Sequence, residues 1–216
     1  GDEPLLLAAH APVFVGADRV ATAKAAIAQG ADILVMDDGF QNPALAKDRA
    51  LVVVDGPAGF GNGRVFPAGP LREPVAWGAA RAAACVCVGE DAHGAAASTG
   101  LPVLRADLAA EGNDLSGAEV LAFAGIGRPG KFFATLEGMG ASVRARREFP
   151  DHHPYSRAEI EALLAEAAKL GARAVTTRKD FVRVPADLRA GLTVVDVRLV
   201  FADGAALDPL LEFARA

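Results

Sequence analysis

The chain has 216 residues, of which 52% are hydrophobic and 23% are charged, and its formal net charge is −5 at pH 7. This apolar fraction excludes an intrinsically disordered protein, because disordered chains have too few apolar residues to build a core. The acidic balance argues against a protein whose main role is to bind nucleic acid, which requires a basic surface. No apolar run approaches the roughly 20 residues of a membrane-spanning helix, and we find no signal-peptide pattern.

Short apolar runs alternate along the chain with alanine-rich segments of helical periodicity. The runs predict strands at residues 13–15, 33–36, 51–54, 85–88, 102–104, 120–124, 141–146, 174–177 and 192–197. The periodic segments predict helices at residues 18–29, 131–138, 157–170 and 207–214. Ser156 and Glu159 have the spacing of a capping box, which marks the start of the third helix. This alternation indicates parallel sheets, so we expect an α/β fold in two lobes, with a boundary in segment 111–117.

The two cysteines, Cys85 and Cys87, are too few for a disulfide scaffold and favour a reducing compartment such as the cytosol. They lie two residues apart in a predicted strand, where alternate side chains share one face. We therefore interpret both as small core residues.

Acidic residues end two of the predicted strands: Asp37 and Asp38 follow the run 33–36, and Asp55 follows the run 51–54. Ligands bind at the carboxyl ends of parallel strands, and Mg²⁺ prefers carboxylate oxygens on a rigid support. The alternative is a turn, since Asp-Gly is a common turn pair. Adjacent carboxylates repel each other unless a cation offsets them. We favour a metal site at Asp37 and Asp38 and a turn at Asp55.

The segment 56–74 is a long loop rich in glycine and proline, and loops of this length in compact domains are usually functional or disordered. It carries Arg64, Arg72 and Glu73. The two arginines can clamp an anionic substrate through bidentate hydrogen bonds, and solvated surface arginines are the alternative.

Two further segments carry candidate chemistry. His152 and His153 stand between an acid and a proline, where a histidine can assist a general base, contact phosphate, bind a metal or be polar surface. The segment 125–130, GIGRPG, matches the glycine pattern of a dinucleotide-binding turn, but Pro129 stands where the helix should donate N–H groups to phosphate. We interpret it as a tight turn, with NAD binding as an alternative. The phosphate-loop motif G-x-x-x-x-G-K-[ST] does not occur in the chain.

Several sequence blocks follow one another in an order that resembles a known family. They are GDEP, DDGFQ, FGNGRVFPAGPLREP, FAGIGRPGKFF, FPDHHPYS and TTRKD. Together they resemble the tetraacyldisaccharide 4'-kinases, bacterial enzymes that phosphorylate a lipid A disaccharide precursor with ATP. The resemblance covers essentially the whole chain. It implies a P-loop-kinase-like parallel-sheet lobe, incomplete at its N-terminus, over residues 1–115 and a smaller α/β lobe over residues 116–216.

Members of that family usually carry further N-terminal sequence, which holds a membrane-associating helix and the phosphate loop. This chain has neither and begins with Gly1 rather than methionine. The resemblance therefore implies the C-terminal two thirds of such an enzyme, and we expect the polypeptide alone to have little or no kinase activity.

The resemblance also implies roles for the residues that match family motifs. Asp2 would accept the proton of the sugar 4'-hydroxyl, and His152 would orient Asp2 and tune its basicity. The residues implied at the magnesium are Asp37, Asp38, Glu3 and Gln41, and those implied at substrate or phosphate are Arg72 and Glu73. Where the family often has Thr-Glu-Lys-Asp, this chain has Arg178 in place of the acid, so we assign Arg178 no role.

The implied partners are ATP, with Mg²⁺ as cofactor, and a lipid A disaccharide 1-phosphate precursor, and no nucleic acid. The enzyme would act as a peripheral protein at the cytoplasmic face of the bacterial inner membrane, through a segment absent from this chain. Two alternatives stay open: a nicotinamide-dependent oxidoreductase built on segment 125–130, and a non-catalytic binding module that kept the scaffold.

Overall fold

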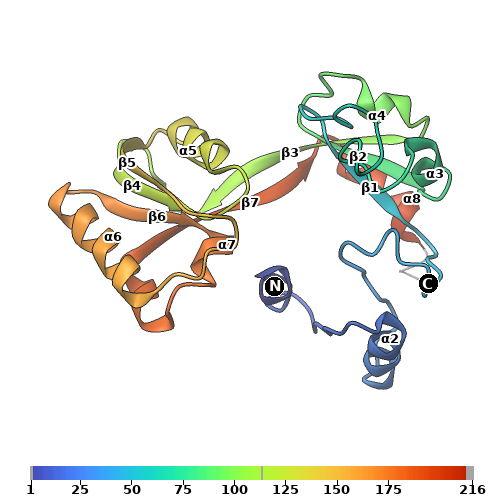
Figure 1. Cartoon of the computed structure of the whole chain (residues 1–216), viewed down its shortest axis with the longest axis horizontal. Helices are drawn as coiled ribbons and strands as arrows, with labels where there is room; N and C mark the ends of the chain where they lie inside the picture. The colour runs from blue at the N-terminus through green and yellow to red at the C-terminus, as the bar shows by residue number, and fades with distance from the viewer. Residues whose placement is uncertain (1, 113, 213–216) are drawn as a thin grey trace. The chain divides into compact units, whose positions relative to one another are not determined.

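The computed structural model describes residues 2–112 and 114–212 (Figure 1). The strands are β1 (Leu51–Asp55), β2 (Ala84–Val88), β3 (Val103–Gly112), β4 (Glu119–Ala124), β5 (Ser142–Glu148), β6 (Arg173–Thr177) and β7 (Leu192–Phe201). The helices are α1 (Asp2–Leu7), α2 (Arg19–Ala28), α3 (Val75–Ala79), α4 (Ala95–Ser98), α5 (Pro129–Gly138), α6 (Arg157–Lys169), α7 (Arg178–Phe181) and α8 (Asp208–Leu211), with 3₁₀ turns η1 (Ala186–Gly191) and η2 (Gly204–Leu207). The sheet has the strand order β1-β2-β3-β7-β6-β4-β5.

The chain divides into two compact units. Unit 1 contains residues 1–13 and 110–198, and unit 2 contains residues 14–109 and 199–216. The long strands β3 and β7 each contribute residues to both units. The division of function between residues 1–115 and 116–216 stays a prediction.

Unit 1 is built around β4, which pairs in parallel with β5 on one side and β6 on the other. Helices α5 and α6 lie on opposite faces of these strands (Figure 1). Leu121 and Phe123 pack against α6, and Val120 and Ala122 pack against α5. A strand covered on both faces must be apolar throughout, which explains the continuous apolar run of β4.

Unit 2 has the parallel strands β1, β2 and β3. Cys85 and Cys87 are fully buried on the face of β2 that α4 covers, and both are free thiols. Ala84 and Val86 face the opposite side, where residues of η2 and α8 pack. The interpretation of the cysteines as core residues is confirmed. Burial raises the pKa of both thiols.

The predicted α/β class is confirmed, as are most predicted elements. The capping box is present: the Ser156 hydroxyl accepts from the Glu159 N–H, and the Glu159 carboxylate accepts from the Ser156 N–H at 2.8 Å. The predicted helix at 207–214 is shorter, because the described part consists of η2 and the one-turn α8. Residues 213 and 214 lie outside the described residues.

Two predicted strands are wrong: residues 13–15 and 33–36 form no strand. Val15 is 73% exposed and Val35 is 93% exposed. A strand requires a neighbour to pair its N–H and C=O groups. Within the described residues, no strand pairs with either run, so an apolar pattern alone did not produce a buried strand there.

Candidate functional site

Asp37 and Asp38 lie in a turn rather than at the end of a sheet strand. Asp38 has a positive φ of 48°, a conformation that aspartate tolerates better than most residues. Gly39 follows it and packs so closely on Met36 that an added Cβ would lie 2.7 Å from the Met36 Cβ. The turn presents both carboxylates at the surface of unit 2.

Arg72 and Asp38 form a bidentate ion pair. Its Nη1 donates to Oδ1 of Asp38 at 2.7 Å, and its Nη2 donates to Oδ2 at 2.9 Å. The hydrogen bonds from Arg72 hold the pKa of Asp38 below its ordinary value. Since the side chains are 61% and 68% exposed, water screens this pair and its partners can exchange.

Gln41 connects this pair to a second one. Its amide oxygen accepts from Arg72 at 3.3 Å, and its Nε2 donates to Glu73 at 3.0 Å. Glu73 in turn accepts two hydrogen bonds from Arg81 at 2.7 and 2.8 Å, which lower its pKa. We call Asp38, Gln41, Arg72, Glu73 and Arg81 the Arg72 cluster. The structure thus joins residues of the DDGFQ and LREP blocks, as a shared site requires.

Arg81 was missed by sequence reasoning. Its guanidinium also lies 5.0 Å from the centroid of the Phe40 ring and donates to the Trp77 carbonyl. It follows α3 in a segment without a motif, so no sequence signal marked it.

The loop that carries Arg72 is ordered by its own hydrogen bonds. Asn62 donates to the Ala68 carbonyl at 2.8 Å and accepts from the Arg64 N–H at 3.1 Å. A Cβ on Gly69 would lie 2.4 Å from the backbone carbonyl oxygen of Arg64, so this close approach requires glycine. The backbone of this loop is therefore fixed, and the Arg64 side chain stays at the surface. A substrate clamp of Arg64 and Arg72 stays a prediction.

Magnesium at Asp37 and Asp38 is chemically possible, because carboxylates are its preferred ligands. Among the described residues Asp37 has no side-chain partner, while both oxygens of Asp38 accept from Arg72. A magnesium ion could therefore bind Asp37 directly. At Asp38 the ion would either bind beside Arg72 or displace the Arg72 guanidinium. Within residues 2–112 and 114–212, no group of three or more His, Cys, Asp or Glu is placed to hold a metal. Glu3 belongs to unit 1.

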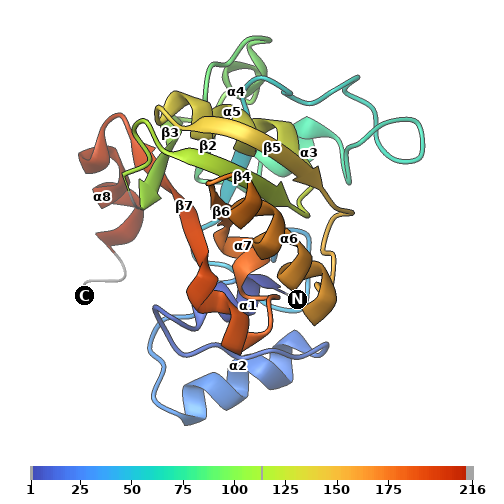
Figure 2. The same cartoon turned by 90° about the vertical axis from the view of Figure 1, so that its left-hand side faces the viewer.

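Unit 1 carries the predicted catalytic residues. Asp2 begins α1, but its side chain lies outside the described residues. Its neighbour Glu3 accepts from Lys179 at 3.0 Å, and α1 lies beside α7 (Figure 2). The pKa of Glu3 is lowered by its own backbone N–H, by Lys179 and by the charge of His152.

His152 lies in a tight turn after β5 with a φ of 59°, and its side chain is 56% exposed. Its N–H donates to the Gly125 carbonyl at 3.1 Å, so the backbone of the turn is pinned to the end of β4. His153 instead faces inward: it contacts Glu159 at 3.0 Å and stacks among Phe149 and Tyr155. The structure separates the pair into one exposed and one packed histidine.

Asp180 was also missed, and it is fully buried. Its Oδ1 accepts from the Gly125 N–H and the Tyr155 hydroxyl, each at 2.9 Å, and Arg183 lies 3.5 Å away. Its Oδ2 accepts from Thr177 at 2.6 Å. We call Gly125, Tyr155, Thr177, Asp180 and Arg183 the Asp180 cluster. The TTRKD block was the available signal, but burial of its aspartate was not visible in the sequence.

The Asp180 cluster also argues against dinucleotide binding at segment 125–130. In such a fingerprint the first glycine forms the tight turn, and the second must let phosphate approach its backbone closely. The second glycine here is Gly127, and a Cβ on it would lie 3.6 Å from a carboxylate oxygen of Asp151, a group that repels phosphate. Here the Gly125 N–H already donates to a buried carboxylate. A Cβ at Gly125 would lie 2.9 Å from the Pro150 carbonyl oxygen, so the protein itself fills this space.

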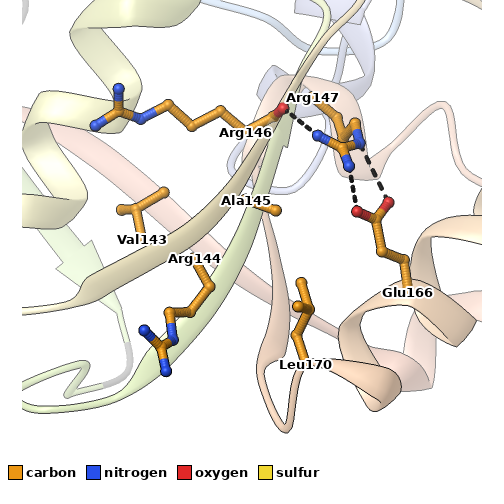
Figure 3. Close-up of a pocket in the computed structure, with 7 residues that line it drawn as sticks. All are labelled: Val143, Arg144, Ala145, Arg146, Arg147, Glu166 and Leu170. Carbon is orange, nitrogen blue, oxygen red and sulfur yellow. Dashed lines mark hydrogen bonds and ion pairs between the residues drawn. The ribbon is translucent and has the colours of Figure 1, made fainter.

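A surface pocket of about 570 Å³ lies elsewhere, along β5 and α6 (Figure 3). Arg147 pairs there with Glu166, and Arg144 pairs with Glu119 at 3.1 Å. Because β5 ends the strand order of the sheet, these charged side chains protect an edge strand from pairing with other chains. The pocket contains none of the predicted site residues.

Comparison with known proteins places this arrangement in a family. The sequence model of the family described as tetraacyldisaccharide-1-P 4'-kinase, LpxK, matches residues 1–214. The chain belongs to the tetraacyldisaccharide 4'-kinase family. It is 57% identical over 216 residues to the tetraacyldisaccharide 4'-kinase of Rhodospirillum centenum, covering 98% of this chain and 64% of the relative. The corresponding kinase of Paramagnetospirillum magneticum is 54% identical, with 98% and 67% covered.

The fold agrees with a solved member of this kinase family. The structure described as the "apo" form of LpxK from Aquifex aeolicus in complex with ATP matches with a TM-score of 0.74 and 25% identity. The match covers 99% of this chain and 68% of that one. The chain thus spans about two thirds of the length of the kinases it matches. In the described part of the chain, no helix is long and apolar enough to cross a membrane.

Proposed function

We propose that this chain forms part of a kinase that transfers the γ-phosphate of ATP to the 4'-hydroxyl of a tetraacyldisaccharide 1-phosphate. The observation that carries the proposal is the family match over residues 1–214, with 57% identity to a named kinase. The ATP complex of the Aquifex relative supports ATP as the donor. The acceptor is a lipid A precursor, so the enzyme would work at the cytoplasmic face of the bacterial inner membrane.

Each unit contributes a different part of this chemistry. In unit 1, Asp2 takes the proton of the attacking hydroxyl and His152 orients Asp2. The packing of α1, which begins with Asp2, against α7 within unit 1 supports this pairing. Phosphoryl transfer depends on positioning and on neutralised charge, so an exposed His152 on a pinned backbone suits the role.

In unit 2, the carboxylates and the guanidinium of the Arg72 cluster would bind Mg²⁺ and the phosphate groups of the substrates. Asp37 and Asp38, with Gln41 beside them, would hold Mg²⁺, which when bound neutralises phosphate charge. Arg72 can exchange its carboxylate partner for a phosphate, because guanidinium binds both in the same bidentate geometry. Glu73, which lies just before α3, is held next to Arg72 by hydrogen bonds from Arg81 and Gln41.

The two alternatives are not favoured. The Asp151 carboxylate beside Gly127 and the packed backbone of Gly125 argue against an oxidoreductase built on NAD. A non-catalytic module has no need for the matching motif residues in both units.

The test is a chimera in which this chain replaces the matching residues of the Rhodospirillum centenum kinase. We expect the chimera to phosphorylate the lipid disaccharide with ATP and Mg²⁺, and the 216-residue polypeptide alone to show little or no turnover. The substitution His152→Ala should lower kcat about 10²- to 10⁴-fold. A chimera that binds NADH but shows no phosphoryl transfer, although folded, would overturn the proposal.

A further inference from the structure

We infer that Asp180 is a positioning residue for His152: it fixes the peptide of Gly125, to which the His152 turn is pinned. The inference rests on the proposed function for the role of His152 in phosphoryl transfer. The placement itself rests only on hydrogen bonds within unit 1.

The connection runs through a single peptide unit. Asp180 accepts from the Gly125 N–H at 2.9 Å, and the Gly125 carbonyl accepts from the His152 N–H at 3.1 Å. His152 has a φ of 59°, which is unfavourable for a residue with a side chain, so surrounding contacts must hold it. The bond to Gly125 is one such contact, and the same His152 N–H also donates to Oδ1 of Asp151 at 3.1 Å. Asp180 holds Gly125 in place through the Gly125 N–H.

Arg183 closes the arrangement from the other side. Its Nη1 donates to the Gly125 carbonyl at 3.2 Å and to the His153 carbonyl at 3.3 Å, and it lies 3.5 Å from Asp180. The Arg183 side chain is only 9% exposed. A buried carboxylate is stable only when paired and hydrogen-bonded, and the same charged pair here also ties down the backbone on both sides of the turn.

Tyr155 adds a permanent donor. Burial and the neighbouring charge of Asp180 raise the pKa of its phenol far above the ordinary value, so the hydroxyl stays protonated. The hydroxyl donates to the same Oδ1 that receives the Gly125 N–H. Three blocks of the sequence, around Gly125, around His152 to Tyr155, and around Asp180, thus converge on one oxygen atom.

The two oxygens of Asp180 offer a matched pair of variants. Asp180→Asn removes the negative charge that both oxygens share, so the hydrogen bond from the Gly125 N–H and the pairing with Arg183 weaken whichever way the amide is oriented. Thr177→Val removes the hydroxyl on Oδ2 and its N-cap bond to the Asp180 N–H, but leaves Oδ1 in place. Both variants destabilise the buried cluster. Only Asp180→Asn should move the His152 turn.

The experiment compares amide and imidazole NMR resonances in the full 216-residue chain with kcat and KM in the chimera. We expect Asp180→Asn to shift the amide signals of Gly125 and His152 and to lower kcat by up to about 10²-fold, as a small misplacement of a catalytic group does, with KM for ATP nearly unchanged. Thr177→Val should leave the His152 signals and kcat near the wild-type values. Equal losses of kcat in the two variants, or unmoved His152 signals in Asp180→Asn, would overturn the inference.

A measurement on the unmodified chain keeps the test decisive if Asp180→Asn does not fold. The amide hydrogens of Gly125 and His152 should exchange slowly, as protected groups do. Rapid exchange of either one would contradict the placement. If the chimera has no kinase activity, the proposed function fails, while slow exchange and the NMR comparison still decide whether Asp180 positions His152.

Discussion

The two charged clusters of this protein use the same residue types in opposite environments. In the Arg72 cluster of unit 2, a bidentate arginine–aspartate pair is more than 60% exposed on both sides. In the Asp180 cluster of unit 1, the aspartate is fully buried and its arginine is 9% exposed. Water screens the first pair and lets its partners exchange, whereas breaking the second leaves buried groups unpaired. The exposed cluster suits ligand binding, and the buried one suits the support of a catalytic turn.

The largest effect is expected from Asp180→Ala. The substitution leaves the Gly125 N–H, the Tyr155 hydroxyl and the Arg183 guanidinium without their shared acceptor, which should destabilise unit 1 by about 3–5 kcal/mol. Urea unfolding can follow the units separately, because the only tyrosine, Tyr155, is in unit 1 and the only tryptophan, Trp77, is in unit 2. If the urea midpoint reported by Tyr155 does not change, the buried Asp180 cluster does not stabilise unit 1 as this comparison states.

On the exposed side, Arg72→Ala should act on activity instead of stability. We expect kcat/KM of the chimera to fall about 10- to 100-fold, with the midpoint of the Trp77 transition nearly unchanged, because the pair is solvent-screened. Arg157→Ala is the matched control, since Arg157 forms a similarly exposed pair with Asp187 at 2.7 Å outside the site. If Arg157→Ala lowers activity as much as Arg72→Ala, the Arg72 cluster has no special role.

A smaller effect sharpens the comparison within unit 1. Ser156→Ala removes the side-chain cap at the start of α6 and should lower the free energy of unfolding by about 1 kcal/mol. The cap is local and exposed, so its loss should leave the amide signals of Gly125 and His152 in place. Urea unfolding followed by Tyr155 fluorescence measures this loss of unfolding free energy. A loss as large as that of Asp180→Ala would contradict the expected order of the two effects.

The smallest effect concerns pH. Hydrogen bonds from Ser156 lower the pKa of Glu159 from 4.5 to about 2. Because the folded-state pKa is the lower one, the stabilisation is fully present above pH 4.5 and is lost as the pH falls toward 2. We expect Glu159→Gln to be less stable than the wild type at pH 7 and nearly equal to it at pH 2. If the difference in unfolding free energy between the two proteins is as large at pH 2 as at pH 7, the lowered pKa of Glu159 is not its cause.

The sequence by itself determined the local features of this protein. Alternating apolar runs gave the α/β class, the spacing of Ser156 and Glu159 gave the start of α6, and the ordered motif blocks gave the family. These features depend on residues close together in the chain, where periodicity and capping follow from helix and strand geometry. The sequence also marked Asp38 and Arg72 separately, as members of two blocks.

Only the tertiary structure decided how distant residues combine. It paired Asp38 with Arg72 across 34 positions and placed Asp180 against Gly125 across 55 positions. It also left the apolar run 33–36 without a strand partner, which the pattern of that run did not foretell. Strand pairing and burial depend on which distant segments pack against a residue, and a local pattern of residues does not contain that information.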